Sequence, residues 1–120
     1  MSIHESGEMY LESILVLREK QGNVRSIDIV NHTGYSKPSI SRAVNLLKKS
    51  GHITVDASGA ISLTPSGEVI AKKIYERHRV LTSFLCSIGV CEQTASADAC
   101  KIEHVISDET LECIKKTMGN

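Results

Sequence analysis

The 120-residue sequence has no tryptophan, a single phenylalanine and only 3% aromatic residues. Hydrophobic residues still make up 41% of the chain, so the expected core is aliphatic and belongs to one compact unit or a small domain with an appendage. No apolar run approaches the roughly 18 residues of a membrane span. The start, Met-Ser-Ile-His-Glu, lacks the pattern of a signal peptide. These absences predict a cytoplasmic protein with reduced thiols and no membrane partner.

The sequence also lacks paired cysteines and a net charge. Its four cysteines (86, 91, 100 and 113) form no Cys-x-x-Cys pair, which excludes zinc-finger and disulfide frameworks. The zero net charge hides an asymmetry, because residues 21–50 carry five basic residues against one acid, a balance of +4. Residues 89–120 carry six acids against three lysines, a balance of −3. The first segment suits an anionic partner and the second suits cations.

The first half of the chain has the pattern of a helix-turn-helix. An apolar stripe that includes Tyr10, Ile14 and Leu17 predicts a helix over residues 7–20. A short helix with Ser26 as its cap follows, and then the turn 33–36. Ser36 as a cap and Pro38 in the first turn predict the start of the next helix, which Gly51 ends.

The rest of the chain adds a hairpin and further helices. Period-two alternation over 52–55 and 60–63 predicts a β-hairpin, the wing of a winged helix. Thr64 and Pro65 open a long helix whose stripe runs from Ile70 to Ile88, and a helix near 92–105 and a last helix capped by Ser107 or Asp108 follow. We therefore expect a mainly α protein. Residues 1–64 would form a winged helix-turn-helix with a small β-hairpin wing, and residues 65–120 a helical metal-binding and dimerisation domain.

The outer face of residues 36–50 carries four basic residues and no acid. Lysines there can neutralise phosphates, and the central Arg42 is long enough to reach a guanine edge. The alternative is an ordinary solvated face, but the charge pattern and the motif together favour double-stranded DNA. A homodimer that reads two half-sites is expected, with the C-terminal helices as its contact surface. The predicted DNA-binding residues are Arg25, Ser36, Lys37, Pro38, Ser39, Ser41, Arg42, Lys48 and Lys49.

The run from Asp98 to Val105 holds a candidate metal site. Cys100, Glu103 and His104 are three and four residues apart, which places them on one helical face. A thiolate, a carboxylate and an imidazole are the donors of a transition-metal site. The alternative is a core cysteine beside a solvated glutamate and histidine. Three ligands leave coordination positions open, and further candidates from elsewhere in the chain are Met9, Glu12 and His78.

Five stretches spread over nearly the whole chain form a specific combination. They are Glu8-Met-Tyr-Leu-Glu12, Tyr35-Ser-Lys-Pro-Ser-Ile-Ser-Arg42, Gly59-Ala-Ile-Ser-Leu-Thr64, Glu76-Arg-His78 and Asp98-Ala-Cys-Lys-Ile-Glu-His-Val-Ile-Ser-Asp108. Together they resemble the metal-dependent repressor family that includes the diphtheria toxin repressor and the manganese transport regulator. The resemblance implies a winged-helix homodimer that binds operators when loaded with ferrous or manganous ion.

The resemblance also implies roles for single residues. Met9, Cys100, Glu103 and His104 fall on the ligands of the regulatory site in iron-type members, and His78 falls on a ligand of a neighbouring site. Glu12 resembles the manganese-type members, which use a carboxylate there. Thr82 and Ser96 stand where iron-type members have further ligands of the neighbouring site. The expected chain is a hybrid, with iron-type ligands on a manganese-type length that lacks the SH3-like C-terminal domain.

The expected function is a metal-activated transcriptional repressor that controls metal-uptake genes. Fe²⁺ is the expected cofactor because thioether and thiolate ligands suit a softer ion than Mn²⁺, which is the alternative. Zn²⁺, Ni²⁺ or Co²⁺ can substitute in vitro. A metal-independent winged-helix regulator is a competing hypothesis, and a small metalloenzyme is another. The sequence has no nucleophile–base pair and no Gly-rich phosphate loop, so we predict that the protein is not an enzyme.

Overall fold

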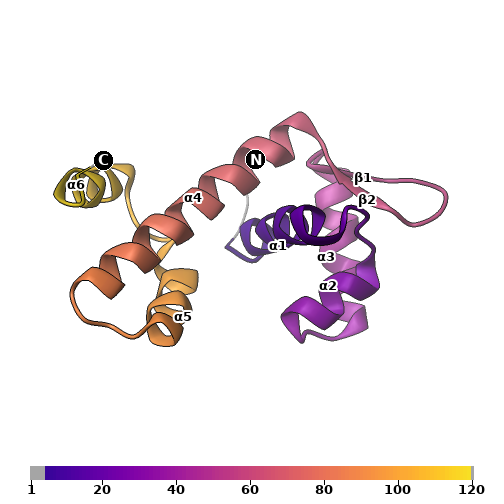
Figure 1. Ribbon diagram of the computed structural model, residues 1–120. Helices are drawn as coiled ribbons and strands as arrows, with labels where there is room; N and C mark the ends of the chain where they lie inside the picture. The colour runs from indigo at the N-terminus through magenta and orange to yellow at the C-terminus, as the bar shows by residue number, and fades with distance from the viewer. Residues whose placement is uncertain (1–4, 120) are drawn as a thin grey trace. The chain divides into compact units, whose positions relative to one another are not determined.

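The computed structural model describes residues 5–119, which fold as two compact units (Figure 1). The first unit ends at Lys72 and the second begins at Lys73, so the boundary falls within the long helix α4 (Pro65–Ser87). Within the described residues, no helix is both long and apolar enough to cross a membrane. Each unit has its own apolar core, and each is described separately below.

The first unit contains three helices, a hairpin and the start of α4. Its elements are α1 (Glu5–Gln21), α2 (Ser26–Thr33), α3 (Lys37–Lys49), β1 (Ile53–Val55) and β2 (Ile61–Leu63). The apolar stripes predicted for the first and third helices are confirmed, because their members are buried in one cluster. Burying each of these aliphatic side chains contributes roughly 1.5–3 kcal/mol before the entropy of folding is subtracted. The helical part of that cluster comprises Tyr10, Leu11, Ile14, Leu15, Leu17, Ile29, Ile40, Val44, Leu47 and Ala71.

The helix caps were predicted correctly at one position and wrongly at another. Ser36 caps α3 as expected, because its Oγ accepts the backbone N–H of Ser39 at 3.3 Å. Ser26 is instead the first residue of α2, and the preceding Arg25 is the N-cap. The Asp28 carboxylate accepts the backbone N–H of Arg25 at 2.9 Å, so a side chain inside the helix stabilises this start.

The hairpin pairs β1 with β2 in antiparallel register, with Ile53 opposite Leu63 and Val55 opposite Ile61. Each strand is one residue shorter at its start than expected. The Asp56 carboxylate closes the loop by accepting hydrogen bonds from the Ser58 hydroxyl and from the backbone N–H groups of Ser58 and Ala60. These hydrogen bonds, the Ser58 hydroxyl first, lower the pKa of Asp56.

The second unit consists of the rest of α4 together with α5 (Glu92–Ile102) and α6 (Asp108–Thr117). Leu81, Ala99 and Leu111, one from each helix, form its buried centre. Ser107 caps α6 by accepting the backbone N–H of Thr110 at 3.1 Å, which decides between the two caps that the sequence allowed.

Two expectations about this unit were wrong. The α5 helix ends at Ile102 rather than at residue 105, because Val105 N–H bonds to the Ile102 carbonyl and tightens the chain into a turn. In addition, the carbonyl of Glu103 accepts a hydrogen bond from the side chain of Arg77, not from a following helical turn. Ile88 was expected to be buried but is 62% exposed, because α4 has already ended at Ser87.

Candidate metal centre

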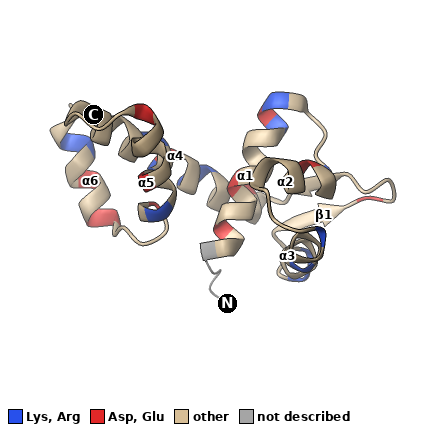
Figure 2. Cartoon of the chain, turned by 90° about the horizontal axis from the view of Figure 1, so that it is seen from below, with Lys and Arg blue, Asp and Glu red and all other residues tan. Residues whose placement is uncertain are grey.

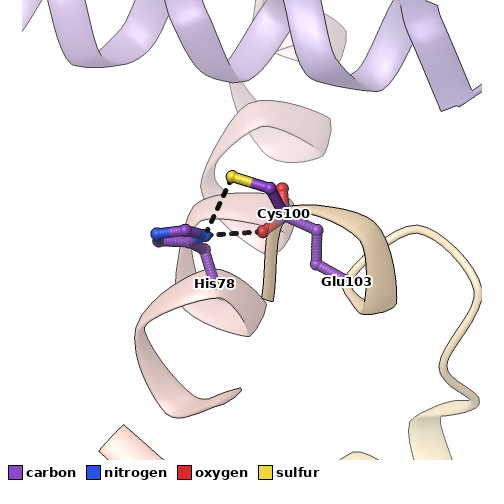
Figure 3. Close-up of side chains that lie close together, drawn as sticks. All are labelled: His78, Cys100 and Glu103. Atoms are coloured by element: carbon purple, nitrogen blue, oxygen red, sulfur yellow. Dashed lines mark hydrogen bonds and ion pairs between the residues drawn. The ribbon is translucent and has the colours of Figure 1, made fainter. Parts of the chain in front are cut away.

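Three side chains of the second unit meet at the end of α5 (Figure 3). His78 comes from α4, Cys100 from the last turn of α5, and Glu103 directly follows that helix. Their candidate ligand atoms all lie within 4.8 Å of one another. The three-residue spacing of Cys100 and Glu103 directs both toward α4, since Glu103 keeps helical backbone angles after the helix has ended.

His78 lies between the other two donors. Its Nδ1 is 2.8 Å from Oε1 of Glu103 and 3.8 Å from Sγ of Cys100. Its second ring nitrogen, Nε2, is 3.3 Å from the Ser96 hydroxyl. Both nitrogens therefore have polar neighbours, which fixes the plane of the imidazole ring. A metal-binding histidine needs such a partner on the nitrogen that faces away from the ion.

Glu103 is the most unusual residue of the cluster because it has no solvent-exposed surface. Oε1 contacts His78, whereas Oε2 makes no hydrogen bond within the described part of the chain. Nε2 of His104 lies 3.5 Å from Oε2, which is an ion-pair distance without a hydrogen bond. A buried carboxylate oxygen without a hydrogen bond costs free energy. A cation coordinated by Glu103 would remove that cost, so the residues present fit a metal ion.

The donor set indicates which kind of ion fits. Imidazole and thiolate are ligands of first-row transition metals, whereas Mg²⁺ and Ca²⁺ require oxygen donors. One sulfur, one nitrogen and one carboxylate would leave coordination positions for further groups. Because Cys100 is exposed, the thiol edge of the cluster is open to solvent.

The structure brings together three of the six predicted ligands and places a fourth beside them. His104 has a 7% exposed side chain and faces the second oxygen of Glu103. His78 lies beside Cys100 and Glu103, although the resemblance assigns it to a neighbouring site. Met9 and Glu12 lie on α1, in the first unit, and both are partly buried.

The two residues that depart from the iron-type pattern lie next to His78. Thr82 donates its hydroxyl to the backbone carbonyl of His78 at 2.7 Å, a bond within α4. Ser96 contacts the His78 ring instead. The hydroxyls of these residues thus hold the backbone and the ring of His78.

The predicted DNA-binding residues lie on the first unit. Lys37, Arg42, Lys48 and Lys49 are all exposed on α3, and Figure 2 shows basic but no acidic residues on this helix. None of the four makes an ion pair with a described residue. Ser36, Pro38 and Ser41 are also exposed, and Ser39 is partly buried. Arg25 differs, because its guanidinium donates to the Ser58 carbonyl at the tip of the hairpin, at 2.5 Å.

One buried residue near the cluster was missed by the sequence analysis. Arg77 precedes His78 and is only 8% exposed. It occupies the position between Ile74 and Leu81 on the inward stripe of α4. A charged residue in an apolar stripe is the signal that could have revealed it, since buried arginines need partners.

Comparison with known proteins assigns the family. Residues 64–120 match the iron dependent repressor, metal binding and dimerisation domain. The chain is 32% identical over 109 residues to the HTH-type transcriptional regulator MntR of Lysinibacillus sphaericus, an alignment that covers 91% of this chain and 78% of that protein. The chain belongs to the metal-dependent repressor family.

Two further relatives of this repressor family show how much of their length the chain shares. MntR of Salmonella typhimurium is 34% identical over 103 residues, which cover 86% of this chain and 66% of MntR. A solved structure described as a manganese-dependent transcriptional repressor in complex with manganese is 28% identical, with a TM-score of 0.87 over 94% of this chain and 52% of that one. The chain therefore spans about two thirds of this MntR and about half of the solved repressor.

Proposed function

We propose that the chain is a metal-activated, DNA-binding transcriptional repressor. The observation that carries this proposal is Glu103, a fully buried carboxylate with one oxygen at His78 and the other without a hydrogen bond. A group of this kind is costly in the metal-free protein and becomes favourable when a cation binds. Family membership supports the same function.

In this proposal His78, Cys100, Glu103 and His104 hold the ion in the second unit. A bound ion would supply positive charge to the buried carboxylate of Glu103. Met9 and Glu12 remain candidate ligands on the resemblance alone. Activation requires that the ion binds the DNA-competent arrangement of the protein more tightly than the alternatives.

The proposed ion is ferrous, with manganous ion as the alternative. The Cys100 thiol favours the softer ferrous ion, whereas the solved structure compared above is a manganese-dependent repressor in complex with manganese. Replacement of both sulfur donors, Met9→Asp with Cys100→Asp, is expected to shift the preference toward Mn²⁺. Anaerobic binding isotherms for both ions measure this shift, and an unchanged Fe²⁺/Mn²⁺ ratio would contradict the assignment of sulfur ligands.

The proposed DNA interface is the exposed basic face of α3. In this interpretation α2, the turn at Gly34 and α3 form a helix-turn-helix, and the β1–β2 hairpin is the wing of a 1–64 winged-helix domain. Residues 65–120 would form the dimerisation domain of a homodimer that reads two half-sites. The regulated genes would be those for metal uptake.

An anaerobic binding titration tests the function. Duplexes selected from a random-sequence library with Fe²⁺-loaded protein serve as operators, and fluorescence anisotropy measures binding with and without Fe²⁺. We expect tight binding only with metal. Equal affinity without metal would support a metal-independent regulator instead. Metal binding with no selectable DNA would remove the repressor proposal altogether.

A further inference from the structure

Arg77 forms a network of hydrogen bonds with Glu103 and with two residues that follow it in the chain. The guanidinium carries five N–H donors and no acceptor, so its burial requires several acceptors. One terminal nitrogen donates to the carbonyl oxygens of Glu103, at 3.1 Å, and Ile106, at 2.9 Å. The other donates to Oδ1 of Asp108 at 2.5 Å. Glu103 and Ile106 lie in the connection between α5 and α6, and Asp108 is the first residue of α6.

These bonds fix the backbone of the buried ligand Glu103. The N–H of Glu103 bonds to the Ala99 carbonyl at 2.9 Å, which continues the pattern of α5. Its carbonyl would have no helical partner after α5 ends, and Arg77 satisfies it. Both polar backbone groups of Glu103 are therefore held, and its side chain extends from a fixed position toward His78.

The same turn of α4 supplies both the support and a ligand. Arg77 and His78 are adjacent in α4, so the residue that holds the Glu103 backbone and the residue that contacts its carboxylate are anchored to the same helical turn. Ile106 and Asp108 extend this support to the first residue of α6. An arginine can satisfy three acceptors at once because its donors form a rigid planar fork.

We propose that Arg77 is a positioning residue of the metal centre. It holds the connection from Glu103 to Asp108 so that the Glu103 carboxylate is in place at His78 before the ion binds. A preorganised ligand needs less rearrangement on binding, so Arg77 raises metal affinity without contacting the metal. This inference rests on the proposed function, because it assumes that Glu103 is a ligand.

The test uses the full-length chain and Co²⁺ as the probe, under anaerobic conditions. Titration yields the Co²⁺ affinity, and the thiolate-to-cobalt absorption band reports the geometry around Cys100. Arg77→Lys keeps the charge, but its single ammonium cannot reach all three acceptors. We expect its Co²⁺ affinity to fall by about 10–100-fold and the absorption band to change. Circular dichroism of the metal-free variant identifies the temperatures at which it is folded.

Two control variants separate positioning from general stability. Leu111→Ala removes a buried side chain from the core of the same unit and should lower stability without altering the cobalt spectrum. Lys73→Met removes the other cation near Asp108, at 3.7 Å, and leaves the Glu103 carbonyl untouched. If Arg77→Lys binds Co²⁺ no more weakly than Leu111→Ala and gives the same spectrum, the positioning role is overturned.

Further variants separate the hypothesis that Glu103 binds metal from the hypothesis that Arg77 positions Glu103. Glu103→Gln should bind Co²⁺ far more weakly than the native chain, and equal binding would overturn the metal centre itself. A native chain that binds Co²⁺ through Glu103, with an unaffected Arg77→Lys, would overturn only the inference about Arg77. If Arg77→Lys does not fold, Asp108→Asn decides, because Asp108 is exposed and accepts one of the three bonds. Its Co²⁺ affinity should be several-fold below that of Lys73→Met, and equal affinities would overturn the proposal.

Discussion

The basic face of α3 and the candidate metal centre after α5 place their charges in opposite environments. On α3 the four cations are exposed, share one sign and have no ion-pair partner among the described residues, so solvent and salt screen each of them. At the metal centre a single carboxylate is fully buried and one of its oxygens has no hydrogen bond. Loss of one cation from α3 should therefore weaken DNA binding only gradually. Loss of one ligand atom at the candidate metal centre should weaken metal binding strongly.

The largest expected effect comes from replacing the buried carboxylate of Glu103. Glu103→Gln removes the negative charge and one donor oxygen while it preserves the shape of the side chain. We expect Fe²⁺ or Mn²⁺ affinity to fall by more than about 100-fold, beyond the usual effect of losing a residue that only supports a ligand. Metal-dependent operator binding should then be abolished in a dimer that remains folded, and His104→Ala should act in the same direction.

Binding isotherms and anisotropy measurements test this prediction. The matched control is Glu109→Gln, which changes an exposed carboxylate in the first turn of α6. Retained metal activation in both the Glu103 and His104 variants would show that these residues are not the regulatory site.

The second effect concerns the stability of the first unit in the absence of metal. A Cβ added to Gly67, in the first turn of α4, would lie 2.0 Å from the backbone carbonyl oxygen of His52. No rotamer can relieve a clash with backbone, so Gly67→Ala must displace α4 from the start of the hairpin. We expect a loss of about 3 kcal/mol in the free energy of unfolding.

Urea denaturation of the metal-free protein measures this loss. Val69→Ala, at a 68% exposed position two residues along the same helix, is the control and should change stability little. A Gly67→Ala variant as stable as the native chain would show that the hairpin and α4 separate easily.

The sequence predicted features whose cause is local. The apolar stripes of α1 and α3, the Ser36 cap and the alternation in the hairpin depend on residues within one or two turns of each other. Six helices and one hairpin could therefore be anticipated in the right order. The basic face of α3 could also be predicted from residues close in sequence, because all its charged residues lie on one helix.

Features that depend on contacts distant in sequence could not be predicted. The carbonyl of Glu103, directly after the end of α5, accepts a hydrogen bond from Arg77, which lies 26 residues earlier in the chain. The proximity of His78 to Cys100 and Glu103 has the same origin, since it requires α4 to pack against α5. Helical spacing explains why Cys100 and Glu103 are neighbours, but their roles as ligands are still predictions.

The third effect separates two kinds of contact on α3. Arg42→Ala should weaken operator binding by about 1–3 kcal/mol and relax the base preference at one position in each half-site. Lys49→Ala should weaken binding to all sequences and reduce the slope of log affinity against log salt by roughly one. Anisotropy titrations at several salt concentrations, with matched and scrambled duplexes, distinguish these outcomes. If both variants lower specific and nonspecific binding equally, the division into base reader and phosphate anchor is wrong.

The smallest expected effect is the pH dependence of folding stability that arises from one carboxyl group in each unit, Asp56 in the first and Asp108 in the second. The hydrogen bond from Arg77, followed by the charges of Lys73 and Arg77, lowers the pKa of Asp108 from its ordinary 3.8. A carboxyl group with a lowered pKa in the folded state stabilises the protein above its ordinary pKa, and this contribution is lost as the pH falls through the folded-state value. Asp108 is largely exposed, so solvent screening keeps the contribution small.

Asp108→Asn should therefore lower the stability of the metal-free chain slightly at pH 7. Below about pH 4 the native chain loses the same contribution, so the two stability curves should converge and the variant should show the flatter pH dependence. The two hydrogen bonds from Arg77 to the carbonyls of Glu103 and Ile106 do not titrate, so the connection should keep most of its order in acid. Asp56→Asn should flatten the acid dependence of the first unit in the same way, because the pKa of Asp56 is also lowered. Urea denaturation at several pH values between 3 and 7, with Glu109→Gln as the control, measures these differences. Parallel pH profiles for Asp108→Asn and the native chain would show that the Arg77–Asp108 pair adds no stability, and that Arg77 holds the α5–α6 connection through the two carbonyl groups alone.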